Sequence, residues 1–174
     1  SEKVIKLPNI WNCHSGIKIN EEVQDLPFLK NNHITFGCFN NSSKITDEVI
    51  EVWAKILLQK NNSKIIIKAP SEDAEIAQES ILKKFKKFEI EDSRIIFSKR
   101  KKNKKDHYKM YNEIDISLDT FPYPGVTTSM ESIWMGVPVL TLKGNNFVSR
   151  CGASINLNLK MPELIAENKN EYIK

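Results

Sequence analysis

The chain has 174 residues, of which 40% are hydrophobic and 28% are charged, with six Gly and seven Pro. This is the length of one ordinary domain with a substantial core, and the composition excludes collagen-like, disordered and disulfide-stapled proteins. The longest apolar runs span only a few residues, such as Ile65–Ile67, so we expect no membrane-spanning segment. The first eight residues also lack the apolar stretch of a secretory signal.

The formal net charge of +4 has a local origin. The segment Lys99–Lys105 (KRKKNKK) contains six basic residues and no acidic one, which leaves 20 basic and 22 acidic side chains in the rest of the chain. The three cysteines, Cys13, Cys38 and Cys151, are widely spaced and form no CxxC motif. A sparse, odd number of cysteines is typical of the reducing cytosol, so we expect a cytoplasmic protein. Because the chain begins with Ser, we also expect it to be a piece of a longer one.

Short apolar segments alternate with amphipathic segments along most of the chain. Val49, Trp53 and Ile56 recur at helical spacing after Thr46, which is a suitable helix N-cap, whereas residues 64–68 contain a continuous run of Ile. The pattern predicts strands over 34–40, 64–68, 94–97, 114–119 and 139–142. It predicts helices over 47–60, from 71 onward, and over 106–111, 127–135, 148–157 and 162–166.

This alternation predicts a Rossmann-like, doubly wound α/β domain over residues 34–174, with a mainly parallel sheet of five or six strands and helices on both faces. Residues 1–33 show little periodicity, and we expect them to form an N-terminal strap or a fragment of a neighbouring domain. Because such sheets bind ligands at the carboxyl ends of their strands, the loops that follow the strands are the candidate site.

The loop after the first predicted strand, 39–44, carries Asn41 and Lys44. A lysine just before a helix N-terminus opposes the helix dipole, which suggests that it serves an anion bound nearby. The alternative is a polar turn with an exposed lysine.

The basic run 99–105 and His107 follow the third predicted strand. Compact ammonium groups at a strand end can neutralise a diphosphate. The alternative is a solvated loop whose charges bind nothing in particular.

The third loop belongs to the segment LDTFPYPGVTTSME, residues 118–131. Two prolines stiffen it, and Gly125 allows the backbone to approach a ligand or to turn sharply. Thr127 and Thr128 stand at a helix start, where free N–H groups and hydroxyls favour an oxyanion, and Glu131 lies one turn further along the helix. The alternative is an ordinary capped helix with a surface glutamate.

Motifs for nucleophilic catalysis are missing from the sequence. It contains no GxSxG, GxGxxG or P-loop pattern, and His14, His33 and His107 lack the spacing of metal ligands. We therefore expect no metal ion and no catalytic base within this chain.

Several blocks of sequence resemble the O-GlcNAc transferase family. They are FGCFNNSSKIT from Phe36, LDTFPY from Leu118, GVTT from Gly125, IWMGVPV from Ile133, SRCGAS from Ser149 and PELIA from Pro162. The blocks keep the family's order and spacing from about Phe36 to Tyr172, which makes them specific as a set. The opening segment up to Pro8 also resembles the end of the family's preceding catalytic half.

The resemblance implies the C-terminal, nucleotide-binding lobe of a two-domain GT-B glycosyltransferase, which usually follows tetratricopeptide repeats. Such an enzyme transfers GlcNAc from UDP-GlcNAc to Ser or Thr of an acceptor protein, with inversion and without a metal ion. The implied partners are a UDP-sugar donor, the acceptor protein, the N-terminal catalytic lobe and the repeats, and no further cofactor is expected. Because the family's proposed general bases lie in the N-terminal lobe, this chain alone is expected to be inactive.

The resemblance also implies roles for single residues. Lys44 would stabilise the departing diphosphate as the catalytic group of this lobe, and Asn41 would contact the diphosphate or the sugar. Lys104 and His107 match a Lys-x-x-His pair that holds the nucleotide, with Lys104 beside the uridine. In the remaining block, Gly125, Thr127 and Thr128 would approach the diphosphate, and Glu131 would bind the ribose.

Two departures from the family pattern affect these assignments. Val126 stands where many members have His or Gly, and Met110 replaces a basic residue. The lysine-rich loop is one residue longer, which bears on the alignment of Lys104. The alternative function is a polyanion- or nucleic-acid-binding module that uses Lys99–Lys105, although aromatic residues are not interleaved with this stripe and only Arg100 can make a bidentate base contact.

Overall fold

The computed structural model describes residues 3, 5, 9–18, 21–69, 75–99 and 101–174. Its six strands are all parallel and form one sheet in the order β3-β2-β1-β4-β5-β6. The strand bounds are β1 Thr35–Cys38, β2 Lys64–Lys68, β3 Ile95–Ser98, β4 Ile116–Leu118, β5 Val139–Leu142 and β6 Ile165–Ala166. This order is that of a doubly wound, Rossmann-like sheet, which confirms the predicted fold class.

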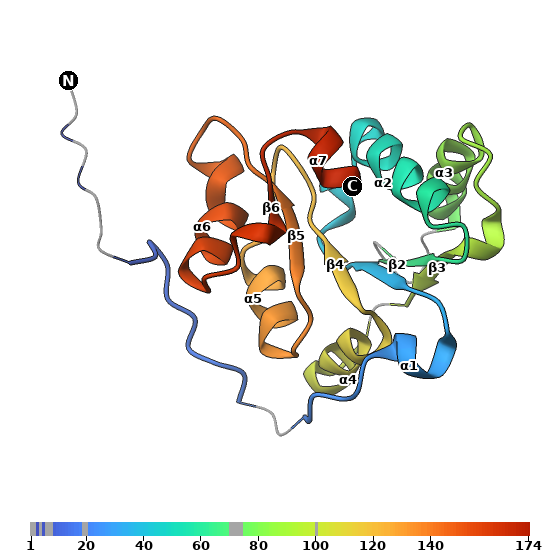
Figure 1. Ribbon diagram of the computed structural model, residues 1–174. Helices are drawn as coiled ribbons and strands as arrows, with labels where there is room; N and C mark the ends of the chain where they lie inside the picture. Colours follow the sequence, from blue (N-terminus) through green and yellow to red (C-terminus); the bar gives the residue numbers. More distant parts are fainter. Residues whose placement is uncertain (1–2, 4, 6–8, 19–20, 70–74, 100) are drawn as a thin grey trace.

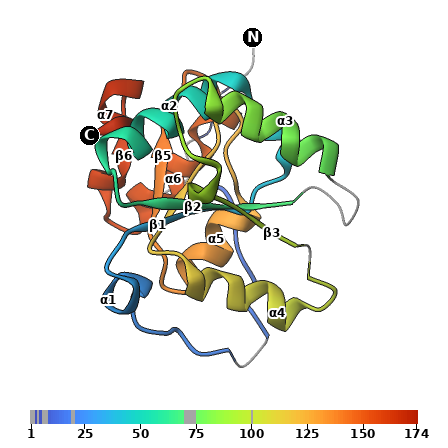
Figure 2. The ribbon, with the colours of Figure 1, turned by 90° about the vertical axis from the view of Figure 1, so that its right-hand side faces the viewer.

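Helices cover both faces of the sheet (Figures 1 and 2). The helix bounds are α1 Pro27–Asn31, α2 Asp47–Gln59, α3 Glu75–Lys86, α4 Lys104–Lys109, α5 Thr127–Trp134, α6 Cys151–Asn158 and α7 Lys169–Ile173. Helices α2, α3 and α7 lie on one face, and α4 and α5 lie on the other, where α6 packs against β5. None of the described helices is long and apolar enough to cross a membrane.

The larger core lies between the sheet and α2. Phe36 and Cys38 of β1 alternate with Gly37, so that the two apolar side chains face α2 and the glycine faces the other side, where a Cβ would overlap Ile114. Trp53 of α2 is fully buried against this core. Thr46 caps α2 by accepting a hydrogen bond from the backbone N–H of Val49 at 3.3 Å, as the sequence pattern predicts.

Several predicted boundaries were wrong. The segment 162–166, predicted as a helix, is a short 3-10 turn followed by β6, because Ile165 pairs with Thr141 of β5. Helices α1 and α7 were not predicted, since both span only five residues and carry little periodicity. The predicted helix over 148–157 divides into a 3-10 turn and α6, and the predicted strands over 34–40 and 114–119 are shorter than expected. The predicted helix start at Ser71 lies outside the described residues.

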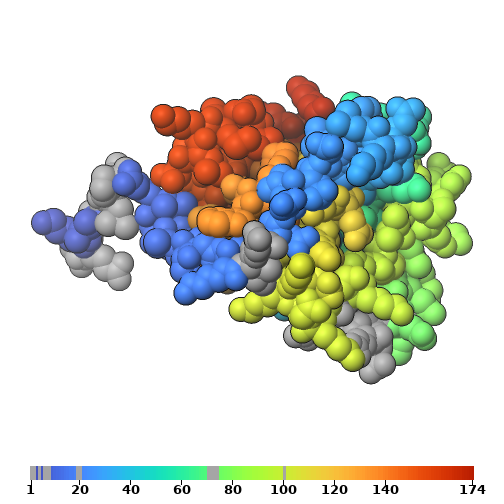
Figure 3. Space-filling model, turned by 90° about the horizontal axis from the view of Figure 1, so that it is seen from below, coloured from blue at the N-terminus to red at the C-terminus, as the bar shows by residue number. Residues whose placement is uncertain are grey.

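The N-terminal segment runs along the α4–α5 side of the molecule (Figure 3). Ile17 packs against a second, smaller core on that side, which includes Tyr111, Ile114 and Met135. Val23 lies so close to Gly136 that a Cβ added to the glycine would be 2.7 Å from Cγ1 of Val23. Glu22 accepts a hydrogen bond through its backbone carbonyl from Asn112 at 3.2 Å. These contacts show how the segment packs here, and its membership of a preceding lobe stays a prediction.

Candidate functional site

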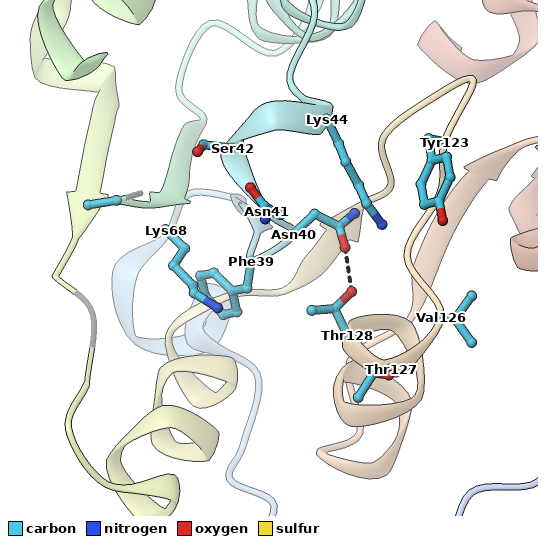
Figure 4. Close-up of a pocket in the computed structure, with 11 residues that line it drawn as sticks. Phe39, Asn40, Asn41, Ser42, Lys44, Lys68, Tyr123, Val126, Thr127 and Thr128 are labelled. Atoms are coloured by element: carbon cyan, nitrogen blue, oxygen red, sulfur yellow. Dashed lines mark hydrogen bonds between the residues drawn. The ribbon is translucent and has the colours of Figure 1, made fainter. Parts of the chain in front are cut away.

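A cavity of about 480 Å³ opens where β1, β2 and β4 end (Figure 4). β1 lies between β2 and β4, so the chain winds away from it in opposite directions. Doubly wound sheets bind their ligands at such a switch point, outside the carboxyl ends of the strands. The lining residues are Phe39, Asn40, Asn41, Ser42, Lys44, Lys68, Ala69, Tyr123, Val126, Thr127 and Thr128.

Lys44 crosses from the loop after β1 to the loop after β4. Its Nζ donates a hydrogen bond to the backbone carbonyl of Pro124 at 2.9 Å and lies 4.4 Å from the centroid of the Tyr123 ring. Partial burial lowers the pKa of the Lys44 ammonium, and the nearby carboxylate of Asp119 opposes that effect. One donor position of the ammonium is occupied by Pro124, so the others remain for a ligand in the cavity.

Asn41 begins the short 3-10 turn Ser42–Lys44. Its Oδ1 accepts a hydrogen bond from the backbone N–H of Ser43 at 3.1 Å and so caps the turn. This hydrogen bond fixes the side chain at the rim of the cavity and leaves its amide N–H groups for a ligand.

Asn40 links three elements beneath the cavity. Its Nδ2 donates to Oδ1 of Asp119 at 3.1 Å and to Oγ1 of Thr120 at 3.0 Å, and its Oδ1 accepts a hydrogen bond from Thr128. The side chain is buried, and Figure 4 shows its contact with Thr128. Asn40 therefore ties the end of β1 to the loop after β4 and to the first turn of α5.

Asp119 holds the proline-rich loop in place. Its Oδ1 accepts hydrogen bonds from the backbone N–H groups of Gly125 at 2.7 Å and Thr120 at 3.0 Å, and its Oδ2 accepts one from Thr141 at 2.9 Å. Complete burial raises the pKa of the Asp119 carboxyl to about 6, although these hydrogen bonds favour the charged form. The buried carboxylate thus fixes where Gly125 places the start of α5.

Gly125 has no room for a side chain. A Cβ at this position would lie 2.6 Å from Oγ of Ser129 and from Oγ1 of Thr128, and 2.7 Å from Oδ1 of Asn40. The absence of a side chain lets the backbone pass directly over the polar network.

The first turn of α5 faces the cavity. Val126 precedes the helix without a capping hydrogen bond from its side chain, so the N–H groups of this turn have no side-chain partner at the N-cap. Thr127 is exposed at the cavity, whereas the Thr128 hydroxyl is engaged with Asn40. Free N–H groups, the positive end of the helix and a nearby ammonium form a binding site suited to a phosphate.

Glu131 lies one turn further along α5, next to the cavity rather than in its lining. Its Oε2 lies 3.1 Å from Nε2 of His107 and accepts a hydrogen bond from the hydroxyl of Tyr111 at 3.2 Å. Burial raises the pKa of the Glu131 carboxyl, but the hydrogen bond and charge of His107 and the hydrogen bond from Tyr111 outweigh it and lower the pKa overall. The Tyr111 hydroxyl also lies 3.2 Å from the backbone carbonyl of Thr128, which connects this cluster to the cavity.

The structure brings most of the predicted site residues together. Asn41, Lys44, Thr127 and Thr128 line one cavity, Gly125 lies beneath it, and the pair His107–Glu131 lies beside it. Lys104 begins α4, is exposed and does not line the cavity. The roles assigned to all of these residues stay predictions.

Three residues of the site were missed by the sequence reasoning: Asn40, Asp119 and Lys68. Each lies at or just beyond the carboxyl end of a predicted strand, and that position is the signal that points to them. Of the basic run, Lys99, Lys101, Lys102, Lys104 and Lys105 are exposed, whereas Arg100 lies outside the described residues. Over the described ranges, no group of three or more His, Cys, Asp or Glu side chains is arranged to hold a metal ion.

Comparison with known proteins places the chain in a family. The model of glycosyl transferase family 41 matches residues 18–174. A protein of Eustoma exaltatum subsp. russellianum, described as a probable UDP-N-acetylglucosamine--peptide N-acetylglucosaminyltransferase SPINDLY, is 36% identical over 173 residues, which are 99% of this chain and 19% of that protein. The chain therefore spans about a fifth of the length of the curated relatives it matches.

Solved structures agree with this placement. A mutant of the Thermobaculum terrenum O-GlcNAc transferase superposes with a TM-score of 0.79 at 34% identity, over 86% of this chain and 29% of that one. The C-terminal domain of a group 1 glycosyl transferase from Francisella tularensis shares the fold, with a TM-score of 0.53 at 15% identity, over 90% of this chain and 87% of that one. The predicted GT-B type of lobe and the resemblance to the O-GlcNAc transferases are confirmed. The chain belongs to glycosyl transferase family 41.

Proposed function

We propose that this chain is the C-terminal, UDP-sugar-binding lobe of an inverting, metal-independent protein O-glycosyltransferase that transfers GlcNAc to Ser or Thr. The observation that carries the proposal is the cavity at the switch point of the sheet, where Lys44 faces the uncapped N-terminus of α5. The printed descriptions of the relatives, as transferases between UDP-N-acetylglucosamine and peptides, support the same donor and acceptor.

In this proposal, the diphosphate of the donor lies between Lys44 and the first turn of α5. When the sugar leaves, negative charge grows on the diphosphate, and the Lys44 ammonium and the backbone N–H groups of the turn stabilise it. Asn40 and Asp119 hold the first turn of α5 in place before the reaction, and the Pro124 carbonyl holds Lys44, so these groups need no reorganisation. Removing one such preorganised donor typically costs about 3–4 kcal/mol of transition-state stabilisation.

The neighbouring groups bind other parts of the donor in this proposal. Glu131 accepts from the ribose hydroxyls, Asn41 contacts the diphosphate or the sugar, and His107 and Lys104 hold the nucleotide. Glu131 is suited to this role because its pKa is held low, so that it accepts hydrogen bonds as a carboxylate at neutral pH.

In this proposal, the general base and the binding site for the acceptor protein lie in other parts of the full-length protein. The relatives are about five times as long as this chain, which leaves room for an N-terminal catalytic lobe and tetratricopeptide repeats. Residues 1–33 would then form the strap from that lobe, in a cytoplasmic protein. The exposed basic run has no interleaved aromatic residues, and a polyanion-binding module is therefore the less supported function.

Titration of the chain with UDP by calorimetry tests the binding function. We expect a Kd in the high micromolar to millimolar range, about 4–6 kcal/mol, because half of the donor site is missing. Replacing Thr127 and Thr128 together with Ala is expected to abolish the binding. Because Thr128 also donates to Asn40, the single substitution Thr127→Ala separates loss of a ligand contact from loss of the network. Absence of any heat of binding at millimolar UDP would contradict the proposal.

A radiolabelled transfer assay tests whether this chain lacks groups that are needed to transfer the sugar. The chain alone is expected to form no glycosylated product, because the other lobe supplies the general base and also covers the bound donor. Product formed by the chain above a Lys44→Ala control would show that the catalytic groups have been assigned to the wrong lobe.

A further inference from the structure

Lys68 is a second cation in the cavity. It is the last residue of β2, it is half-buried, and it lines the cavity together with Phe39 and Asn41. Figure 4 shows Lys68 on the Phe39 side of the cavity and Lys44 on the Tyr123 side. Within the described part of the chain, the Lys68 ammonium makes no ion pair and no hydrogen bond, so its charge faces the cavity without a partner there.

The charges of the cavity match those of a nucleotide sugar. Among the residues that the structure describes, its lining contains Lys44 and Lys68 and no acidic residue. A nucleoside diphosphate sugar carries two phosphates with one negative charge each at neutral pH, which equals the number of ammonium groups. A partly buried ammonium loses hydration, and a bound phosphate offsets that loss.

The neighbours of the two lysines indicate which phosphate each one meets. Lys68 lies on the Phe39 side of the cavity, and the Phe39 ring packs edge-on against Tyr111 with their centroids 4.9 Å apart. The Tyr111 hydroxyl donates to Glu131 at 3.2 Å, so Lys68 lies on the Glu131 side. Lys44 instead contacts Pro124 and Tyr123 of the loop after β4.

We propose that Lys68 binds the phosphate next to the nucleoside and Lys44 binds the phosphate next to the sugar. The inference rests on the proposed function, since it takes Glu131 as the group that faces the ribose. Lys104 lies outside the cavity lining, so Lys68, not Lys104, supplies the second positive charge at the diphosphate.

The chain offers a matched control on the same strand. Lys64 and Lys68 are the two ends of β2, and both are half-buried. Lys64 lies at the amino end of the strand, among the residues around a different cavity at the opposite edge of the sheet. Lys68→Met and Lys64→Met therefore remove the same charge and keep a similar chain length, but only the first acts at the proposed site.

The test is a nuclear magnetic resonance titration of the wild-type chain and both variants with UDP and with UMP, which keeps only the phosphate next to the nucleoside. Lys68→Met is expected to weaken both ligands by about tenfold or more, because a charge-assisted hydrogen bond is lost, and Lys64→Met by less than about twofold. The effect of Lys68→Met is expected to shrink as salt is added. The amide spectra report in the same samples whether each variant is folded, and Lys68→Arg, which keeps the charge, is expected to bind UDP far better than Lys68→Met.

The outcomes separate the two proposals. Wild-type affinity of Lys68→Met for UDP would overturn the role of Lys68. Weaker binding of UDP with unchanged binding of UMP would overturn its assignment to the phosphate next to the nucleoside. If the wild-type chain itself does not bind UDP, the proposed function fails, and the inference about Lys68 falls with it.

Discussion

Replacement of Asn40 tests the network beneath the cavity. Asn40→Ala removes the hydrogen bond to Asp119 at 3.1 Å, the one to Thr120 at 3.0 Å and the one accepted from Thr128. A hydrogen bond to a charged group contributes about 1.5–3 kcal/mol and a neutral one about 1 kcal/mol, so we expect the free energy of unfolding to fall by about 3–5 kcal/mol.

Asn40→Asp separates the geometry of the network from its charge. The substitution places a second carboxyl group against Asp119, whose pKa burial has already raised to about 6. While the two carboxyls share a proton, the new side chain can donate to Asp119 and accept from Thr128, as Asn40 does. The folded state binds the shared proton more tightly than the unfolded state does, so the proton stabilises the fold. This contribution is complete below about pH 4 and is lost as the pH rises through the raised pKa of the pair.

The order of stability of the two variants is therefore expected to reverse with pH. If the folded state holds one additional proton between pH 5 and pH 8, the free energy of unfolding falls by up to about 4 kcal/mol over that rise in pH. Asn40→Asp is expected to be more stable than Asn40→Ala at pH 5 and less stable at pH 8. Urea denaturation followed by circular dichroism at the two pH values, with the wild-type chain as reference, measures both differences. Equal losses for the two variants at both pH values would refute the charge argument, and an Asn40→Ala variant within about 0.5 kcal/mol of wild type would refute the network itself.

Three further outcomes are expected. Lys44→Met should weaken UDP binding by at least about tenfold, since it removes a preorganised ammonium, and should weaken UMP binding less; calorimetry with both ligands checks this. Gly125→Ala should lower the free energy of unfolding by about 1–3 kcal/mol and weaken UDP binding, because its Cβ would press on oxygens of Ser129, Thr128 and Asn40 at 2.6–2.7 Å; urea denaturation and UDP titration of one sample give both numbers. Lys104→Ala should weaken UDP binding far more than Lys101→Ala if the Lys-x-x-His assignment is right, and equal effects in calorimetry would count against it.

The alternation of short apolar segments with amphipathic segments along the sequence determined most of the fold. The Ile run of β2 and the helical spacing of Val49, Trp53 and Ile56 in α2 are local patterns, and a buried strand and an amphipathic helix follow from them directly. The candidate loops followed as well, because the rule that ligands bind at the carboxyl ends of parallel strands needs only the strand positions. Asn41, Lys44, Thr127 and Thr128 were found in this way.

The tertiary structure decided which distant segments pair and which distant residues meet at the site. Ile165–Ala166 is a strand only because it pairs with β5, and no local pattern reports that pairing. Asn40 and Asp119 are 79 positions apart, so their hydrogen bond depends on the neighbouring positions of β1 and β4 in the sheet. Lys68 ends an ordinary strand, and only the strand order places its ammonium beside the same cavity as Lys44. Local propensity selects helices and strands, whereas the convergence of charges on one ligand site requires the long-range order of the sheet.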